Sequence, residues 1–559
     1  MSNLIIIELL LILFISPSCV HDQRGKDKVI VVHARGITHP DLINYMQSSD
    51  HYGFFNLSEK NGFIRKLYPI VNAVTICNIA SFETGLLPAE HGVIGHSFGK
   101  VENNSIIPVS GFSQRFSTET FWEKAEKNGK NVLNVGALIL HGKYDKHRNV
   151  DCLAQGEEKN TGGFLQLITD QKTKNDSIVK YTNLNGNYQF QMHDGFSDSL
   201  FAYSLNNEIL VFDNDYNKTN GFIGELKKGA WIEIGNKKDD GLKEPFRVKW
   251  IDTRNDTLDL YLRASYNNRG FPNEFVKRID EKVGGSKGWP NIPLYSLNQI
   301  SGNTLVEEIN AELDYVMDVF FYANQLKEYE LIMIDYPLMD RYGHAFLNLK
   351  DSSQQIQKYY HDAFNRMDKD FARIAEFAKQ NDYELIVTSG HGFSPIHTSI
   401  NIDKLLLEKE INTNVQENTW VAKGLPGKVS AHIYINDQLG ANKKESVLQE
   451  TEKVFENLIL PNSNKIMVDA IYRKDELDEV GMNNKFAGDL YVLLNPGFVF
   501  QNQSAETDKI FDTPIFKGDH GYSLKHKESF GILISNEQCN LCNSTDVAKM
   551  IVEKLKLND

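Results

Sequence analysis

Two short stretches of the sequence contain side chains that could carry out hydrolytic chemistry. In the first, a hydrophobic run over residues 68–74 predicts a strand that ends at Thr75, and a helical interval follows over residues 78–82. The Thr75 hydroxyl could attack a substrate covalently, and the Asn78 amide could donate to the oxyanion that develops. The N–H groups and the dipole of a helix N-terminus favour a phosphoryl or sulfuryl oxygen. The alternative is a β-branched residue at a strand end, followed by an ordinary helix cap.

The second stretch could bind a metal ion. Asp340 and His344 lie four residues apart in a Gly-containing segment that follows a buried strand over residues 331–334. That spacing can bring a carboxylate and an imidazole to one ion, and such O and N ligands suit zinc. A capped turn is the alternative explanation of so short a pattern.

An open α/β sheet would position both stretches, because ligands of such sheets bind beyond the carboxyl ends of the strands. Apolar runs predict sheet strands over residues 29–32, 130–140, 331–334, 384–388, 489–494 and 531–534. Helical periodicity predicts helices over residues 121–127, 305–325, 353–380 and 544–555, the last capped by Ser544 or Thr545.

Residues 142–301 differ in character from the rest of the chain. They are rich in Asn, Asp, Gly and Lys, and short alternating runs predict strands over residues 208–213, 230–234, 246–251 and 257–264. We therefore expect a β-rich insertion at one edge of the sheet. Its role is either to wall one side of the substrate site or to elaborate the surface away from the chemistry.

Composition limits the classes of partner. The chain has 559 residues, of which 41% are hydrophobic and 24% charged, as in ordinary globular proteins. Its formal net charge of -14 excludes broad contact with a nucleic acid duplex. A small anionic substrate would therefore need local positive charge from a metal ion or from a few Arg and Lys side chains.

The N-terminus predicts export. Residues 4–15 form an apolar run that is too short to span a bilayer, and Ser16-Pro17-Ser18-Cys19 follows it. We interpret residues 1–19 as a secretory segment with Cys19 as a lipid-attachment site, which predicts the periplasm, the outer membrane or the cell surface. An unprocessed hydrophobic N-terminus is the alternative. Near the other end, Cys539 and Cys542 predict a short-loop disulfide or two unpaired thiols rather than a zinc site.

The first stretch also resembles the nucleophile segment of a known family. It matches the pattern Thr-x-x-Asn followed by Thr-Gly-x-x-Pro-x-x-His-Gly, carried here by Thr75, Asn78, Thr84, Gly85, Pro88, His91 and Gly92. This pattern is that of the alkaline phosphatase superfamily, in its type I phosphodiesterase/nucleotide pyrophosphatase branch. Five separated segments resemble the family in its order, from residue 28 to the end. The resemblance implies an α/β/α sandwich around a mostly parallel sheet, with core parts at 28–141 and 302–559 and the insertion at 142–301.

The resemblance also implies two metal sites, which differ in how well this chain keeps them. Asp340, His344 and His520 match the ligands of the first site. At the second site His391 is kept, but Arg35 and Gly390 stand where the family has two Asp ligands. We therefore expect one zinc ion, with a doubtful second site, and we expect the Arg35 guanidinium to take over some of the missing charge and to bind an anion. His391, without a second metal ion, could then serve as the base for Thr75.

Three functions follow as expectations. The first is a hydrolase of small phosphate esters that uses Thr75 and one metal ion. The second is a catalytically degenerate homologue that binds an anionic ligand or a glycan at the cell surface, because a Thr hydroxyl without an activating metal ion is a poor nucleophile. The third is a sulfatase or phosphonate hydrolase on the same scaffold, although Thr75-Ile76-Cys77-Asn78 does not fit the Cys-x-Pro-x-Arg run of common sulfatases.

Overall fold

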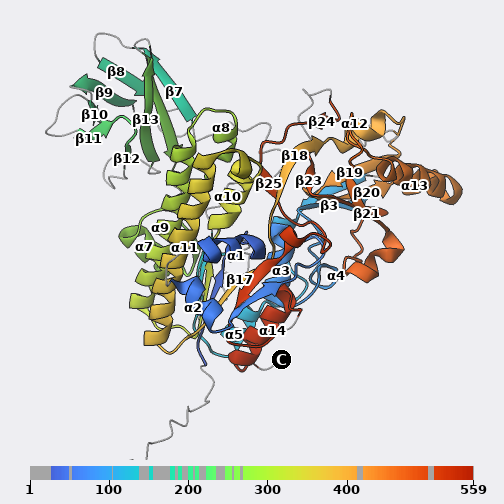
Figure 1. Ribbon diagram of the computed structural model, residues 1–559, viewed down its shortest axis with the longest axis horizontal. Helices are drawn as coiled ribbons and strands as arrows, with labels where there is room; N and C mark the ends of the chain where they lie inside the picture. Colours follow the sequence, from blue (N-terminus) through green and yellow to red (C-terminus); the bar gives the residue numbers. More distant parts are fainter. Residues whose placement is uncertain are drawn as a thin grey trace, which may run out of the picture.

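The centre of the molecule is an eight-stranded, mostly parallel sheet (Figure 1). The computed structural model describes residues 27–48, 53–102, 105–137, 150–154, 177–182, 187–191, 199–205, 208–212, 222–234, 246–254, 257–264, 268–411, 420–501, 509–539 and 541–557. Strands β6, β5, β16, β1 and β17 pair in parallel, and the outer strands β15, β26 and β2 each pair antiparallel with their neighbours. Across the sheet the order is β15 (Arg269–Phe271), β6 (Val150–Ala154), β5 (Val132–Ala137), β16 (Leu331–Asp335), β1 (Val29–His33), β17 (Glu384–Ser389), β26 (Gly531–Ile534) and β2 (Ile64–Leu67).

Both faces of the sheet are buried, as the continuous apolar strands predict. In β1, Ile30 and Val32 belong to one hydrophobic cluster, while Val29 and Val31 belong to another on the opposite face. The first cluster includes side chains of α1 (His39–Ser48), α9 (Gly302–Leu326) and α11 (Gln354–Gln380), and the second includes side chains of α5 (Phe121–Lys127) and α14 (Ser544–Lys554). The expected α/β/α sandwich is therefore confirmed.

The β-rich insertion forms two four-stranded antiparallel sheets that project beside the helices of one face (Figure 1). One sheet has the order β11 (Phe222–Lys227), β10 (Glu208–Phe212), β9 (Ser199–Leu205) and β8 (Asn187–Gln191), and the other β12 (Trp231–Ile234), β13 (Phe246–Arg254), β14 (Thr257–Ala264) and β7 (Ser177–Thr182). Arg263 anchors the second sheet to α9, because its Nη1 donates to Glu308 Oε2 at 2.7 Å. The projecting part is smaller than residues 142–301, since β6 and β15 extend the central sheet.

A second peripheral unit lies within the part that the sequence assigned to the core. It consists of the sheet β19 (Ala422–Pro426), β20 (Ser430–Ile435), β22 (Leu490–Leu494) and β21 (Val468–Arg473), which is accompanied by α13 (Ala441–Glu456). A further small sheet joins β23 (Gly497–Phe500), β18 (Ser394–Ile400) and β24 (Phe511–Asp512), and β25 (Gly518–Asp519) also pairs with β18. These strands connect the peripheral unit to the segment that carries His520.

Several local predictions need correction. Residues 68–74 do not form a strand: Tyr68 makes an isolated bridge, and turns lead directly into α3 (Thr75–Thr84), so Thr75 opens the helix rather than ending a strand. Asp340 and His344 lie on a helix, α10 (Leu338–Phe346). The cap of α14 is Asn543, whose side chain accepts from the Thr545 N–H, rather than Ser544 or Thr545 itself.

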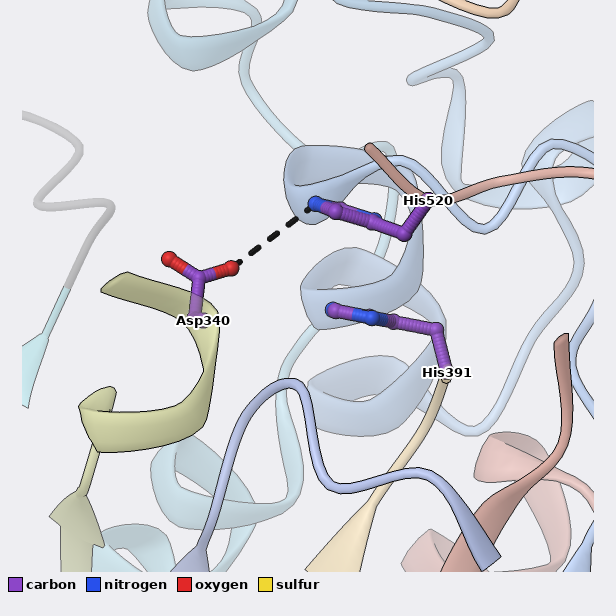
Figure 2. Close-up of side chains that lie close together, drawn as sticks. All are labelled: Asp340, His391 and His520. Carbon is purple, nitrogen blue, oxygen red and sulfur yellow. Dashed lines mark ion pairs between the residues drawn. The ribbon is translucent and has the colours of Figure 1, made fainter. Parts of the chain in front are cut away.

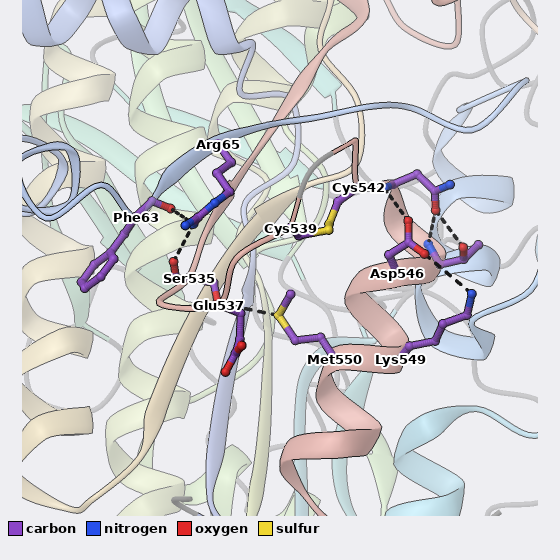
Figure 3. The surroundings of a disulfide bond; sticks show 11 residues. Phe63, Arg65, Ser535, Glu537, Cys539, Cys542, Asp546, Lys549 and Met550 are labelled. Carbon is purple, nitrogen blue, oxygen red and sulfur yellow. Dashed lines mark hydrogen bonds and ion pairs between the residues drawn. A yellow bond between two sulfur atoms is a disulfide. The ribbon is translucent and has the colours of Figure 1, made fainter. Parts of the chain in front are cut away.

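Two further predictions concern cysteines and membranes. Cys539 and Cys542 form a disulfide in the turn that precedes α14 (Figure 3), which resolves the choice between a disulfide and two thiols. None of the described helices is both long enough and apolar enough to cross a membrane. Residues 1–19, including Cys19, lie outside the described residues.

Candidate active site

The predicted site residues meet beyond the carboxyl ends of three adjacent strands. Arg35 follows β1, His391 follows β17, and α10 with Asp340 begins three residues after β16 ends. His520 comes directly after β25, and Thr75 is the first residue of α3. Gly36, with φ of 83°, permits this convergence, since an added Cβ there would lie 2.5 Å from the Asp340 nitrogen.

Three histidines present the same ring edge to the site. His344 Nδ1 lies 2.9 Å from Gly518 O, His520 Nδ1 lies 2.9 Å from Ala73 O, and His391 Nδ1 lies 3.0 Å from Gly392 O. A carbonyl can only accept, so each Nδ1 carries the proton and each Nε2 is left as an acceptor or a ligand. The rings of His391 and His520 stack with centroids 3.7 Å apart, and Figure 2 shows both pointing toward Asp340.

The two oxygens of Asp340 have different surroundings. Oδ2 accepts from Arg341 Nη1 at 3.0 Å and from Arg35 Nη1 at 3.3 Å. Oδ1 is buried without a hydrogen-bond partner among the described residues, and it lies 3.8 Å from the Nε2 atoms of both His344 and His520. An unpartnered buried carboxylate oxygen would be costly unless a cation completes its surroundings.

This arrangement fits a metal ion. Two ligand atoms about 2.0–2.1 Å from a tetrahedral zinc ion are separated by about 3.3 Å, and the 3.8 Å spacings here are close to that value. Among the described residues, two groups could hold an ion: Asp340 with His391 and His520, and His344 with Asp519 and His520. The Nδ1 hydrogen bonds to carbonyls are the outer contacts that orient metal-binding histidines. Asp340 Oδ1 thus lies near both other predicted first-site ligands, His344 and His520, although each of the two groups contains only two of these three residues. His391 joins Asp340 and His520 in the first group.

Burial keeps the imidazoles neutral at physiological pH. Desolvation lowers the pKa of His344 to about 3 and that of His391 to about 4, and it places the pKa of His520 well below the ordinary value. For Asp340, burial alone would raise the pKa, but the Arg35 charge and other neighbouring positive charges hold it below the ordinary value. Neutral imidazoles and an ionised carboxylate are the protonation states that bind a metal ion.

Arg35 is fully committed to carboxylates of the protein. Its Nε and Nη2 donate to the two oxygens of Asp335 at 2.8 and 2.9 Å, and its Nη1 donates to Asp340. The side chain is only 1% exposed. The bidentate edge that the sequence analysis assigned to a substrate anion therefore faces Asp335, and Arg35 acts on the site through Asp340.

Asn78 fills the position of the second missing carboxylate. A Cβ added to Gly390 would lie 2.2 Å from Asn78 Nδ2 and 2.4 Å from its Oδ1, so no side chain fits at residue 390 while Asn78 keeps its place. Ser544 holds the amide, because its hydroxyl donates to Asn78 Oδ1 at 2.6 Å. Asn78 Nδ2 is left as a buried donor without a partner among the described residues, against residue 390. The role predicted for the amide, a donor to an oxyanion, stays a prediction.

Thr75 lies against His520 rather than against His391. Its Oγ1 is 3.3 Å from His520 Nε2, and the side chain is buried at the helix N-terminus. His391 Nε2 has no hydrogen-bond partner among the described residues. The contact that the structure contains therefore puts the Thr75 hydroxyl next to a candidate metal ligand, and the predicted pairing with His391 as base stays a prediction.

Sequence reasoning missed several charged residues of the site. Arg341 binds Glu312 at 2.6 and 3.0 Å besides Asp340, and Lys428 binds Asp519 at 3.3 Å. Asp335 could have been found, because it ends a buried strand at the edge where ligands bind. Lys428 carries no such signal, since it comes from a hairpin of the peripheral sheet.

A small, partly open pocket borders Asp335, the partner of Arg35. It has a volume of about 30 Å³ and is lined by His33, Glu83, Asn134 and Asp335 among others. Burial raises the pKa of Glu83 to about 8, and Trp122 Nε1 donates to this carboxyl group at 3.2 Å. Glu83 is therefore largely protonated at neutral pH, so it adds little charge to the pocket.

The fold is shared with a solved structure at low sequence identity. The crystal structure of phosphonoacetate hydrolase from Sinorhizobium meliloti 1021, in complex with phosphonoformate, matches at a TM-score of 0.53 and 12% identity, over 95% of this chain and 96% of that chain. Murine ectonucleotide pyrophosphatase/phosphodiesterase 5 matches at a TM-score of 0.47 and 13% identity, over 95% of both chains. No curated protein sequence matches this chain at a significant level.

The family model for type I phosphodiesterase/nucleotide pyrophosphatase matches residues 29–523, nearly the whole described chain. This match confirms the family predicted from the nucleophile segment, and with it the enzyme class, phosphoric ester hydrolases. The chain belongs to the type I phosphodiesterase/nucleotide pyrophosphatase family.

Proposed function

We propose that this protein hydrolyses small phosphate esters, using Thr75 as the nucleophile and one zinc ion held by Asp340, His344 and His520. The observation that carries the proposal is the convergence of Asp340 Oδ1 with the Nε2 atoms of His344 and His520, beside the Thr75 hydroxyl. A bound zinc ion would supply Lewis-acid stabilisation of a phosphoryl oxygen and would favour the ionised form of a nearby hydroxyl.

The protein's own groups would orient and stabilise the reacting phosphoryl group. Thr75 stands at the first position of α3, so the N–H groups of that helical turn face the same region as its hydroxyl. Asn78 Nδ2 is the additional donor to the charge that develops on the phosphoryl oxygens. His391 Nε2, a buried acceptor without a hydrogen-bond partner among the described residues, is the group that takes up or returns a proton.

The charges around Asp340 favour one metal ion over two. Glu312, Arg341, Asp340, Arg35 and Asp335 form a continuous chain of ion pairs, in which three carboxylates against two guanidiniums leave a net charge of -1. Asp519 and Lys428 cancel one another. One dication would therefore bring the centre to +1, which matches the single negative charge of a phosphodiester. We place phosphodiesters first among the substrates for this reason.

The second metal site of the pattern is replaced by side chains. Arg35 stands where the pattern has one Asp ligand, and its guanidinium pairs with the carboxylates of Asp335 and Asp340. The other Asp ligand of the pattern is replaced by Gly390, and Asn78 occupies the space of its side chain. A cation there would face a fixed positive charge with His391 and Thr75 as the remaining ligands. We therefore assign one ion to this centre.

The test combines metal analysis with a panel of esters. Zinc-loaded protein should contain one zinc per chain and should hydrolyse bis(4-nitrophenyl) phosphate faster than 4-nitrophenyl phosphate, 4-nitrophenyl sulfate or phosphonoacetate. Thr75→Ala should abolish turnover while it keeps the zinc. Absence of turnover of every ester by fully loaded protein would favour a degenerate, ligand-binding homologue, and faster turnover of the sulfate or the phosphonate would reassign the substrate.

We also propose that the protein is exported and attached to a membrane by a lipid on Cys19. The disulfide between Cys539 and Cys542 supports the export, because disulfides persist in oxidising compartments such as the bacterial periplasm.

A further inference from the structure

Lys428 is a buried lysine next to the candidate metal centre. It lies in the hairpin between β19 and β20, and its side chain is only 9% exposed. Lysine is rarely buried to this extent unless its charge is paired, because desolvation disfavours the ammonium form. The hairpin belongs to the peripheral sheet, so this residue reaches the site from outside the α/β core.

The backbone around Lys428 is held in an uncommon conformation. Its φ of 76° lies in the left-handed region, which a residue with a Cβ adopts at a cost. Three hydrogen bonds fix the hairpin, from Gly427 N to Ser430 O at 2.7 Å, from Phe500 N to Lys428 O at 2.6 Å and from Leu494 N to Val429 O at 2.9 Å. These hydrogen bonds hold the strained backbone of the hairpin in one conformation, and they thereby keep the Lys428 ammonium at a fixed place.

That place is beside the metal-binding histidines. Lys428 Nζ lies 3.3 Å from Asp519 Oδ1, and the Asp519 carboxylate lies within 4.8 Å of ring nitrogens of His344 and His520. The contact is longer than the 2.7–2.9 Å or so of a strong charge-assisted hydrogen bond, and Asp519 Oδ1 also accepts from the His520 N–H at 2.9 Å. Phe516 lies below the ammonium, with its centroid 6.0 Å from Nζ and 5.0 Å from the His344 ring centroid.

The positive charge lies close to the centre itself. The partner of Lys428, Asp519, has a carboxylate oxygen within 4.8 Å of ring nitrogens of His344 and His520. A cation at this range attracts an anion that is bound at the same centre. Arg35 cannot play this part, since its donors face Asp335 and Asp340.

We propose that Lys428 binds an oxyanion group of the substrate beside the metal centre. This inference rests on the proposed function, for which it supplies the substrate contact that Arg35 does not provide. The ammonium donates to the oxyanion from beside Asp519, whereas Arg35 is held by Asp335 and Asp340. The oxyanion is either an oxygen of the attacked phosphoryl group or a second anionic group of the same substrate.

The test measures anion binding without turnover. Inorganic phosphate and inorganic pyrophosphate are titrated calorimetrically into zinc-loaded wild type, Lys428→Met and Lys428→Arg. Lys423→Met is the matched control, because Lys423 lies in the same hairpin but pairs with Asp403. We expect Lys428→Met to weaken the binding of at least one anion 10-fold or more, Lys428→Arg to stay within about 3-fold of wild type, and the control to bind as wild type does.

The two anions distinguish the two kinds of contact. An equal loss for phosphate and pyrophosphate places Lys428 on the attacked phosphoryl group, and a larger loss for pyrophosphate places it on a second anionic group. Unchanged binding of both anions in Lys428→Met overturns the proposal, and so does a loss of zinc in that variant, which would make Lys428 a support of the ligand set. If wild type hydrolyses no ester, the proposed function fails, while the phosphate titration still decides the role of Lys428.

Discussion

Because Arg35 pairs with two buried carboxylates, its replacement should lower the thermal stability by a predictable amount. Arg35→Met removes the cation but leaves Asp335 and Asp340 buried beside one another. Breaking a buried ion pair by removal of one partner costs about 3–5 kcal/mol. Unfolding entropy of about 2.1 cal/mol/K per residue gives about 1.2 kcal/mol/K for 559 residues, so the midpoint of thermal unfolding should fall by about 3–4 °C.

A double-mutant cycle isolates the pair itself. Asp335→Asn removes the bidentate partner, and the double variant Arg35→Met/Asp335→Asn removes both charges. The double variant should be more stable than the sum of the two single losses predicts, by about 1–3 kcal/mol. Arg473→Met is the control, since Arg473 forms a partly exposed pair with Glu452 and its loss should cost about 1 kcal/mol or less.

Thermal scans of metal-free protein, followed by calorimetry, are the assay. An unfolding midpoint of Arg35→Met within 1 °C of wild type would refute the reasoning, because the carboxylates would then not need the guanidinium. Phosphate titration of the double variant separates the two roles considered for Arg35. If Arg35 acts only by balancing the charge of the buried carboxylates, stability and phosphate affinity recover together in the double variant, whereas a substrate contact would leave the affinity low after stability returns.

Three further outcomes are expected. Gly390→Ala should lower ester hydrolysis at least 10-fold, because its Cβ would displace Asn78; Gly224→Ala, where an added Cβ meets nothing, should not. In thermal scans, the stability of Glu83→Gln relative to wild type should increase as the pH rises from about 4.5 to about 8. Over that range folded wild type retains a Glu83 proton that the unfolded chain loses, so wild type loses stability while the Gln variant does not. A stability difference that does not change with pH would contradict this. Mass spectrometry of membrane-extracted protein should find a lipidated N-terminus at Cys19, and retention of residues 1–18 would refute export.

The parts of the site that were predictable are those on regular elements. Buried strands of the central sheet are recognisable as apolar runs, and the side chains that follow β1, β16 and β17 must meet because parallel strands end at one edge. The Asp340 and His344 pair was recognised from its four-residue spacing, which the structure shows to be about one turn of α10. The family pattern then connected these residues to Thr75 and His520.

The unpredicted parts depend on contacts between distant segments. From the sequence, Gly390 indicates only the loss of a ligand. The structure shows that Asn78, held by a hydrogen bond from Ser544, occupies the space that a side chain at residue 390 would need. From the sequence, Arg35 indicates a cation that is free to bind an anion. Its hydrogen-bond partner in the structure, Asp335, lies 300 residues away in the sequence. No periodicity or spacing encodes such pairs, because they arise from tertiary packing.

The most direct measurement of the central claim is a zinc titration of metal-free protein while the hydrolysis of bis(4-nitrophenyl) phosphate is followed. We expect the rate to rise linearly and to reach its plateau at one zinc per chain, and we expect no hydrolysis by Thr75→Ala at any zinc content. A plateau at two zinc ions per chain would contradict the replacement of the second site by Arg35 and Asn78, and no hydrolysis at any zinc content would contradict the proposed enzyme.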